Sequence, residues 1–380
     1  MADWTGTDFH IGELKIQAPV VQGGMGIGIS MSGLASAVAK EGGIGVISAA
    51  GVGVLSGGSG ALSQDRAALR VEIAKARAKT DGVIGVNIMS ALTNFEEMAR
   101  TAMEEKIDII FAGAGLPLRL PEFRPQGCRT KLVPIVSSAR AADQIARWWF
   151  KRYRCIPDAF VVEGPKAGGH LGFHPEQIDD PDYRLERIIP EVVAAVRPHE
   201  KTAGRKIPVI AAGGIFTGQD IFRFLRLGAS AVQMATRFVV TEECDADIRF
   251  KQAFVNCREE DIEMIKSPVG MPGRAIKNEF LQRAASGEEK PKNCPYHCIV
   301  SCRQEKGAYC ITHALVNACR GDLKNGFVFI GANGSRVREI TTVHRLMEEL
   351  ASGYQKTARL EQLPDVKENK TRLPGKETEE

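Results

Sequence analysis

Two apolar runs of this sequence end in small residues, as expected of turns that bind a phosphate. One run ends in Gly213 and Gly214, and another ends in the turn 233–236. Paired glycines let the backbone approach a phosphate closely, and a helix expected from Gly218 would offer N–H groups that lack partners. Either turn alone would fit an ordinary tight turn. Together they predict a phosphate site built from Gly213, Gly214, Gln233, Met234, Ala235 and Thr236.

A third glycine-rich turn follows the first apolar run, where Gly23, Gly24, Met25 and Gly26 are consecutive. A planar ring needs a wall of backbone where a Cβ would clash, and glycine supplies one. Read alone this stretch is a weak signal, but it is compatible with a flat cofactor beside Gly24 and Met25.

His170 is the histidine that directly follows an apolar run, and glycines lie on both sides of it. A neutral imidazole there could act as a general base, and a protonated one could hold an anion. A structural contact within the loop is the alternative. Lys166 adds a cation nearby, and Met25, Met89 and Met271 could line a pocket for a small aliphatic group or simply pack.

Five of the nine cysteines fall in one segment, at positions 294, 298, 302, 310 and 319. If Cys298 and Cys302 lie on one helix, they share a face, and Cys294 could join them from the preceding turn. With Cys310 these thiolates could hold a [4Fe–4S] cluster or Zn²⁺, although the spacing matches no standard pattern. Free thiols are an equal alternative.

The elements that must position these residues are eight short apolar runs, each followed by a helical pattern. The runs are continuous rather than alternating, as in strands that are buried on both faces. Strands that alternate with helices predict a parallel sheet, and eight such units predict a (β/α)8 TIM barrel, with an open doubly wound sheet as the alternative. The runs are 18–25, 44–50, 83–89, 107–115, 132–138, 159–169, 207–215 and 229–236.

The pattern changes after Thr236. We expect the barrel to occupy 1–240, an inserted, mostly helical cysteine-containing subdomain to occupy 241–325, and 326–356 to return to the barrel with its last helix. Within the insertion 241–266 and 275–285 read as helices around a loop, and the last helix is expected from Ser335 to about Ser352. The charged, apolar-poor residues 363–380 predict a disordered tail.

Composition narrows the function classes. Charged residues make up 25% of the chain and the net charge is only +4, with both signs interleaved, which argues against nucleic acid as a partner. No apolar stretch reaches the roughly 20 residues that span a bilayer, so no membrane association is expected. The first ten residues do not resemble a signal peptide, and we expect a cytoplasmic protein. A homodimer is an expectation from the barrel class alone.

Together these elements resemble the nitronate monooxygenases, formerly called 2-nitropropane dioxygenases, and equally the flavin-dependent enoyl-acyl-carrier-protein reductases. The resemblance is carried by 22–25, 167–170, 212–215 and 233–238, and it runs from about Ile16 to Arg274 and again over 331–350. The cysteine segment has no counterpart in most members.

The resemblance implies a non-covalent FMN. By position, Asn87 would contact the isoalloxazine ring, Glu163 and Gly168 would help to hold the cofactor, and His170 matches the catalytic histidine. Ala235 stands where glycine is usual, which costs little if its φ angle is negative.

The reaction implied first is the oxidation of nitronates by O2 to a carbonyl compound and nitrite, with His170 as the base or anion-holding group. The alternative is an NAD(P)H-dependent FMN reductase of enoyl thioesters or quinones, for which the sequence has no dinucleotide fingerprint. A third class is a sensory flavoprotein in which the cysteine segment is the working part.

Overall fold

The protein is described by a computed structural model that covers residues 2–55, 62–290, 296–300, 302 and 307–362. Each of the eight apolar runs contains one strand of a single parallel sheet, which confirms the expected strand order. The strands are β3 (Val20–Gln22), β4 (Gly45–Ser48), β5 (Ile84–Met89), β6 (Ile109–Gly113), β7 (Lys131–Val136), β8 (Phe160–Glu163), β10 (Val209–Ala212) and β11 (Ala231–Met234).

The sheet closes between its two end strands, β3 and β4. Val21 forms a parallel bridge with Ile44, and the N–H of Gln22 donates to the Ile44 carbonyl at 2.9 Å. The fully buried side-chain amide of Gln22 adds a further link, because its Oε1 accepts from the N–H of Val46 at 2.9 Å. The fold is therefore the predicted (β/α)8 barrel rather than an open sheet.

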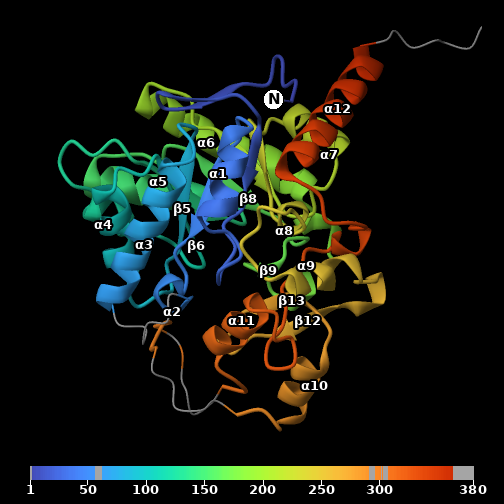
Figure 1. The fold of residues 1–380 in the computed structure, drawn as a ribbon. Helices are drawn as coiled ribbons and strands as arrows, with labels where there is room; N and C mark the ends of the chain where they lie inside the picture. The colour runs from blue at the N-terminus through green and yellow to red at the C-terminus, as the bar shows by residue number, and fades with distance from the viewer. Residues whose placement is uncertain (1, 56–61, 291–295, 301, 303–306, 363–380) are drawn as a thin grey trace, which may run out of the picture.

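Helices cover the outside of the barrel (Figure 1). Their apolar faces are buried against the strands, as amphipathic patterns require. They are α1 (Ser32–Lys40), α2 (Val52–Leu55), α3 (Leu62–Arg77), α4 (Phe95–Glu104), α5 (Ala139–Tyr153), α6 (Leu185–Ala203), α7 (Gly218–Arg226), α8 (Thr236–Val239) and α12 (Val343–Gln362). Short 3₁₀ turns are η1 (Leu120–Phe123), η2 (Pro175–Gln177), η3 (Pro181–Tyr183), η4 (Glu259–Asp261) and η6 (Gly334–Arg336).

An N-terminal hairpin, β1 (Phe9–Ile11) and β2 (Leu14–Ile16), plugs one end of the barrel. Phe9, Ile11 and Ile16 join the inward-facing side chains of the strands in one buried apolar cluster. In Figure 1 this hairpin lies at the top and residues 241–325 lie at the opposite end. The open end of the barrel is therefore the end that bears the carboxyl termini of its strands, where barrel enzymes place their sites.

The described residues of the inserted segment contain three α-helices and also a β-hairpin that the sequence does not predict. The helices are α9 (Ile248–Val255), α10 (Glu279–Ser286) and α11 (Ile311–Cys319), and the strands are β12 (Ile262–Lys266) and β13 (Pro272–Ile276). The expectation of one helix over 241–266 is wrong outside α9. Residues 241–247 are not helical, and after Val255 the chain enters β12, which pairs with β13. Strand β13 also pairs with β9 (Gly169–His170), so the insertion forms a sheet with the histidine loop.

A cluster of aromatic rings forms a core for the insertion. Phe280 and Phe327 stack at 6.1 Å between ring centroids, and Tyr309 meets both rings edge-on. Phe329 extends this cluster toward the barrel with its ring centroid 4.9 Å from that of Phe327. The cluster ties 326–330 to the insertion before the chain returns to the barrel.

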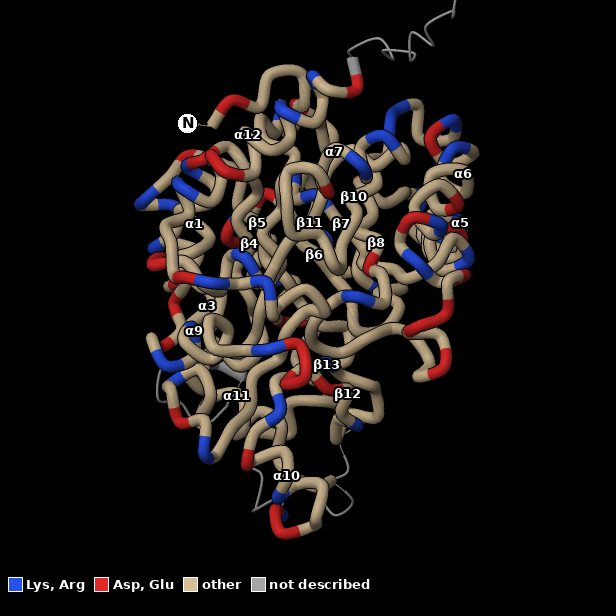
Figure 2. The backbone as a smooth tube through the Cα atoms, turned by 90° about the vertical axis from the view of Figure 1, so that its right-hand side faces the viewer, with Lys and Arg blue, Asp and Glu red and all other residues tan. Residues whose placement is uncertain are grey.

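The last helix begins later than predicted. Residues 335–342 are not part of it, because Thr341 forms a bridge with Thr241 and the Thr342 hydroxyl accepts from the N–H of Arg345. Helix α12 then packs along α7. The predicted tail, 363–380, lies outside the described residues. In the part of the chain that is described, no helix is long and apolar enough to cross a membrane, and both signs of charge are interspersed along the backbone (Figure 2).

Candidate active site

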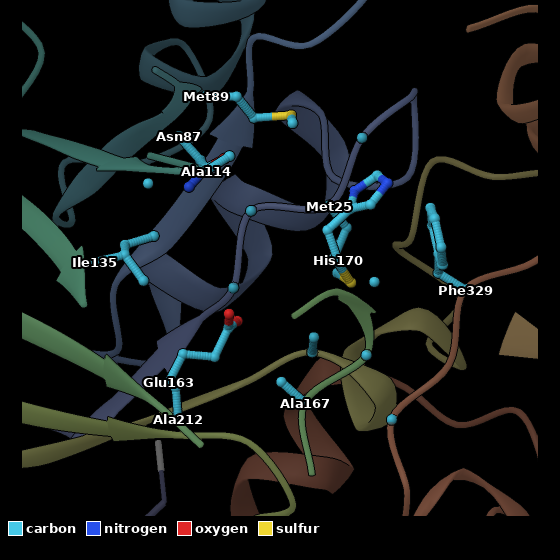
Figure 3. Close-up of a pocket in the computed structure, with 18 of the residues that line it drawn as sticks. Met25, Asn87, Met89, Ala114, Ile135, Glu163, Ala167, His170, Ala212 and Phe329 are labelled. Carbon is cyan, nitrogen blue, oxygen red and sulfur yellow. The ribbon is translucent and has the colours of Figure 1, made fainter. Parts of the chain in front are cut away.

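A cavity of about 620 Å³ opens at the carboxyl ends of the barrel strands. This volume is within the range of small-molecule and cofactor sites. Every residue that the sequence assigns to cofactor binding or catalysis lines it, and Figure 3 shows several of them around the space. These residues are Gly24, Met25, Asn87, Glu163, Gly168, His170, Gly213, Gly214, Gln233, Met234, Ala235 and Thr236.

The turns 213–214 and 233–236, which are the proposed phosphate loops, lie side by side at one corner of the cavity. Gly213 and Gly214 have φ angles of +100° and +83°, a region that favours glycine. A Cβ on Gly213 would lie 2.9 Å from the Gly164 carbonyl oxygen, so the close approach of these backbones also requires glycine. Ala235 has a φ of −122°. Alanine is therefore unstrained there, as the sequence analysis anticipates.

The helix after Gly214, α7, is capped by its own side chains. The Thr217 hydroxyl accepts from the N–H of Asp220, while the Asp220 carboxylate accepts from Phe216 and Thr217. This capping box satisfies those three groups and leaves the N–H groups of Gly218 and Gln219 without an acceptor in the helix. The shorter helix α8 begins at Thr236, and its first N–H groups likewise have no acceptor within that helix.

A turn from the returning segment clamps both phosphate loops. The side-chain amide of Asn333 donates to the carbonyl oxygen of Gly214. The N–H of Gly331 donates to the Thr236 hydroxyl at 3.3 Å, and the N–H of Ala332 donates to the Lys166 carbonyl at 3.1 Å. Residues 331–333 thus join three strand ends around the corner where a phosphate would be held.

The glycine-rich turn after β3 forms a flat wall on another side of the cavity. A Cβ on Gly24 would lie 2.2 Å from the Cβ of Asn87, so only glycine fits between this turn and β5. The N–H of Gly23 donates to the Met234 carbonyl at 2.8 Å, which places the wall beside the second phosphate loop. A planar group that extends from that loop would lie along Gly24 and Asn87.

His170 faces the cavity from β9, next to Met25 and Phe329 (Figure 3). Its Nε2 is 2.7 Å from the Oγ of Ser267, and the Phe329 ring meets the imidazole edge-on at 5.0 Å between centroids. Burial lowers the pKa of His170 to about 4. The imidazole is therefore neutral at physiological pH.

Two further ionisable groups line the cavity. Glu163 ends β8, and burial raises the pKa of its carboxyl to about 7, so the neutral form is substantially populated near neutral pH. Lys166 is exposed, and its side chain passes over Gly214. Met25, Met89 and Met271 also contribute to the wall, as expected of an apolar pocket.

Residues 298 and 299 of the cysteine segment lie at the open end of the barrel. Ile299 pairs with Leu92 in the loop after β5, and the Cys298 thiol lines the cavity 2.9 Å from the Thr312 hydroxyl. Cys298 and Cys302 do not share a helix, because the chain is extended at Ile299. Cys310 precedes α11. Cys294 lies outside the described residues, and among those described no cluster of His, Cys, Asp or Glu could hold a metal ion.

Four residues of this site are absent from the sequence predictions. They are Ser267 beside His170, Phe329 against the imidazole, Arg274 behind the histidine loop, and Asn333 on the phosphate loop. Asn333 follows the apolar residues 327–331, but this position in the sequence does not indicate what its amide contacts. The others come from a hairpin and a strand-like segment more than 90 residues after His170.

These features are typical of barrel enzymes that hold a cofactor at the carboxyl-terminal end of the barrel. They are the closed barrel, the glycine-rich turns around its cavity and the histidine that faces the cavity. The nitronate monooxygenase family model matches residues 8–105 and 92–353. The chain therefore belongs to the nitronate monooxygenase family and is an FMN-dependent oxidoreductase. The residues present fit this cofactor, because glycine-rich turns at 23–24 and 213–214 border a cavity of about 620 Å³, a size typical of cofactor sites.

Individual relatives differ in their activities. The chain is 28% identical to a nitronate monooxygenase of Pseudomonas aeruginosa, over 90% of this chain and 99% of that one. It is 29% identical to a Mycobacterium tuberculosis protein named (3aS,4S,5R,7aS)-5-hydroxy-7a-methyl-1-oxo-octahydro-1H-indene-4-carboxyl-CoA dehydrogenase, over 72% of this chain and 67% of that one. A Rhodococcus jostii protein of the same name is matched over 64% of its length.

Among solved structures, FabK from Thermotoga maritima superposes with a TM-score of 0.70 at 28% identity, covering 91% of this chain and 95% of that one. This neighbour connects the family to the enoyl reductases.

Proposed function

We propose that the protein oxidises alkyl nitronates with O2, using FMN held in the barrel cavity, to give a carbonyl compound and nitrite. Bound there, FMN would supply the electron transfer between substrate and oxygen. Residues 1–240 and 326–356 would hold the cofactor, with Gly213, Gly214 and the turn 233–236 at its phosphate. The insertion, 241–325, would cover the site.

The observation that carries this proposal is the partly buried imidazole of His170, which lines the cavity 2.7 Å from the Ser267 hydroxyl and whose pKa burial lowers to about 4. A base with a pKa near 4 is poorly matched to removing a proton from a carbon acid at neutral pH. A nitronate is already an anion and needs only a hydrogen-bond donor. We therefore assign His170 to holding the substrate anion and expect neutral nitroalkanes to be poor substrates.

Glu163 and Lys166 set the charge around that anion. A protonated Glu163 adds no repulsion, and the exposed ammonium of Lys166 favours the approach of an anion. An ionised Glu163 would oppose nitronate binding, so affinity should fall as the pH rises above about 7.

A second function is favoured by the likeness to FabK and to the indene-carboxyl-CoA dehydrogenase of Mycobacterium tuberculosis, which spans most of the barrel. It is the NAD(P)H-dependent reduction of an enoyl thioester or a quinone on the same FMN. Lys166 at the cavity would then contact a phosphate of the donor or of the thioester. With a pKa of about 4, His170 is almost wholly deprotonated at neutral pH, so it has few protons to donate in such a reduction. The reductase is therefore the second candidate.

The test uses the purified FMN-bound protein with propionate 3-nitronate, 3-nitropropionate, NADH and NADPH, each with and without oxygen. We expect oxygen-dependent nitrite from the nitronate, little from the nitroalkane, and only slow bleaching by the reduced nucleotides. Rapid bleaching by NADH or NADPH without nitrite from the nitronate would establish the second function instead. In His170→Asn we expect bound flavin with turnover lowered by about 10²-fold or more.

A further inference from the structure

The hydroxyl of Ser267 lies 2.7 Å from the Nε2 of His170 and comes from the inserted hairpin, not from the barrel. The backbone around Ser267 is closely tied. Its N–H donates to the Met271 carbonyl at 3.1 Å, and its carbonyl accepts from the N–H of Gly270 at 3.0 Å. Ser267 is 3% exposed. The hairpin therefore holds this side chain in one place beside the imidazole.

The hydrogen-bond partners of the hydroxyl indicate which way its proton points. The N–H of Val269 donates to Oγ at 3.4 Å, so Oγ already accepts one hydrogen bond. Within the described residues, the acceptor in reach of the hydroxyl proton is Nε2 of His170. A buried hydroxyl donates where an acceptor is available, because leaving its proton unpaired costs free energy.

A neutral imidazole carries one proton, and the nitrogen that accepts a hydrogen bond cannot carry it. If Nε2 accepts from Ser267, the proton is on Nδ1. The Phe329 ring against the imidazole and the pairing of His170 with Gly273 restrain both the ring and its backbone. No protein group within the described residues hydrogen-bonds Nδ1, which leaves its N–H for a ligand in the cavity.

We propose that Ser267 is a positioning residue that fixes His170 as the Nδ1–H tautomer, so that His170 presents a hydrogen-bond donor and not a base to the substrate. This inference rests on the proposed function for the identity of the acceptor, which would be a nitronate oxygen. The tautomer itself is independent of the reaction. The insertion thus determines the chemistry of a histidine that the barrel supplies.

The direct test is ¹⁵N NMR of the FMN-bound protein labelled at histidine, since protonated and unprotonated ring nitrogens differ widely in chemical shift. His170→Asn assigns the signals. We expect the wild-type protein to have Nδ1 protonated and Nε2 unprotonated at pH 7. A protonated Nε2 would overturn the proposal, whether or not nitronate is the substrate.

Variants separate this role from a structural one. Ser267→Ala should give a mixture of tautomers and lower kcat on propionate 3-nitronate by about tenfold, the size expected for one lost hydrogen bond. FMN affinity should change less than about twofold, and Ser267→Thr should restore both the tautomer and kcat. The matched control is Ser286→Ala, whose exposed hydroxyl bonds within α10 at 3.0 Å from the Arg283 carbonyl.

The outcomes distinguish the two proposals. Failure of nitrite formation with an intact Nδ1–H tautomer would contradict only the proposed nitronate oxidation. An unchanged tautomer in Ser267→Ala would contradict the role of Ser267, even if nitrite forms at the expected rate.

Discussion

The guanidinium of Arg274 donates to the carbonyl oxygen of Ala167 at 2.5 Å, and the same nitrogen donates to the Pro165 carbonyl at 2.8 Å. Arg274 lies on β13 of the insertion, and both carbonyls belong to the loop that leads to His170. Burial lowers the pKa of Arg274, while the charge of Asp179 opposes that shift. The buried guanidinium joins the insertion to the histidine loop through these two backbone carbonyls.

Arg274→Lys should therefore impair catalysis more than cofactor binding. A lysine ammonium is a compact, strongly hydrated charge on a flexible stem, so it is costlier to bury and held less firmly against these two carbonyls than the planar guanidinium. Small displacements of a reacting group can cost up to about 10²-fold in rate, and we expect kcat to fall by about 10- to 100-fold. Steady-state kinetics and FMN titration measure the two effects. The control is Lys266→Ala, which removes an exposed cation from the paired strand β12 and should leave kcat near the wild-type value. An equal fall in kcat in both variants would refute the role of Arg274.

Gly213→Ala should weaken FMN binding. A residue with a Cβ in the left-handed region costs about 1–2 kcal/mol, and here the Cβ would also meet the Gly164 carbonyl at 2.9 Å. We expect the dissociation constant for FMN to rise about tenfold or more, measured by flavin fluorescence.

The matched control is Gly204→Ala at the end of α6. Gly204 has a φ of +64°, but a Cβ there would have no neighbour within 4 Å. This variant should lose about 1 kcal/mol of stability and retain its FMN affinity. If both alanine variants bind FMN like the wild type, Gly213 does not belong to the phosphate site.

The barrel strands could be predicted because each is buried on both faces. A strand of this kind has a continuous run of apolar residues, which is visible in the sequence. The pairs at Gly213–Gly214 and the turn 233–236 then followed from strand order. The pairing of β9 with β13 could not be predicted, because Gly169 and His170 are too short a strand to show a pattern and their partners lie about 100 residues later.

The helix expected over 241–266 shows the limit of local periodicity. In a stretch as short as 262–266, the order of apolar and polar residues is compatible with either a strand or a helix. Pairing with β13 decides that it is a strand. Single polar residues such as Ser267 and Asn333 acquire their roles only from such long-range pairing. The residues that the sequence singles out therefore line one cavity, whereas the groups that contact them from the insertion and the returning segment could not be predicted.

Asn333→Ala should increase the rate of FMN release. Its side-chain amide holds the Gly214 carbonyl, and losing this bond frees the loop that would enclose the phosphate. We expect the dissociation rate to rise about five- to tenfold, a loss of about one hydrogen bond, measured by the release of flavin fluorescence after dilution. Asn325→Ala removes an exposed amide that bonds Asp322 at 2.8 Å and is the control. Equal release rates in the two variants would contradict the clamp.

Glu163 and His170 should make opposite contributions to the pH dependence of stability in the flavin-free protein. The pKa of Glu163 is raised from 4.5 to about 7, so the folded state binds more protons and stability is lost as the pH rises through this window. The pKa of His170 is lowered from 6.5 to about 4, so the unfolded state binds more protons and stability is lost as the pH falls through that window. Between pH 4.5 and 6.5 the two slopes oppose each other.

Single variants should therefore reveal slopes that the wild-type protein hides. Glu163→Gln removes the contribution to stability that falls as the pH rises. The free energy of unfolding of this variant should therefore rise with pH relative to that of the wild type. His170→Asn should show the reverse, each by on the order of 3 kcal/mol at most over its window. Urea unfolding at intervals from pH 4.5 to 7 measures this, and the double variant should return to the wild-type slope because the two contributions are removed together. Parallel curves for wild type and both single variants would mean that neither group is buried with a shifted pKa.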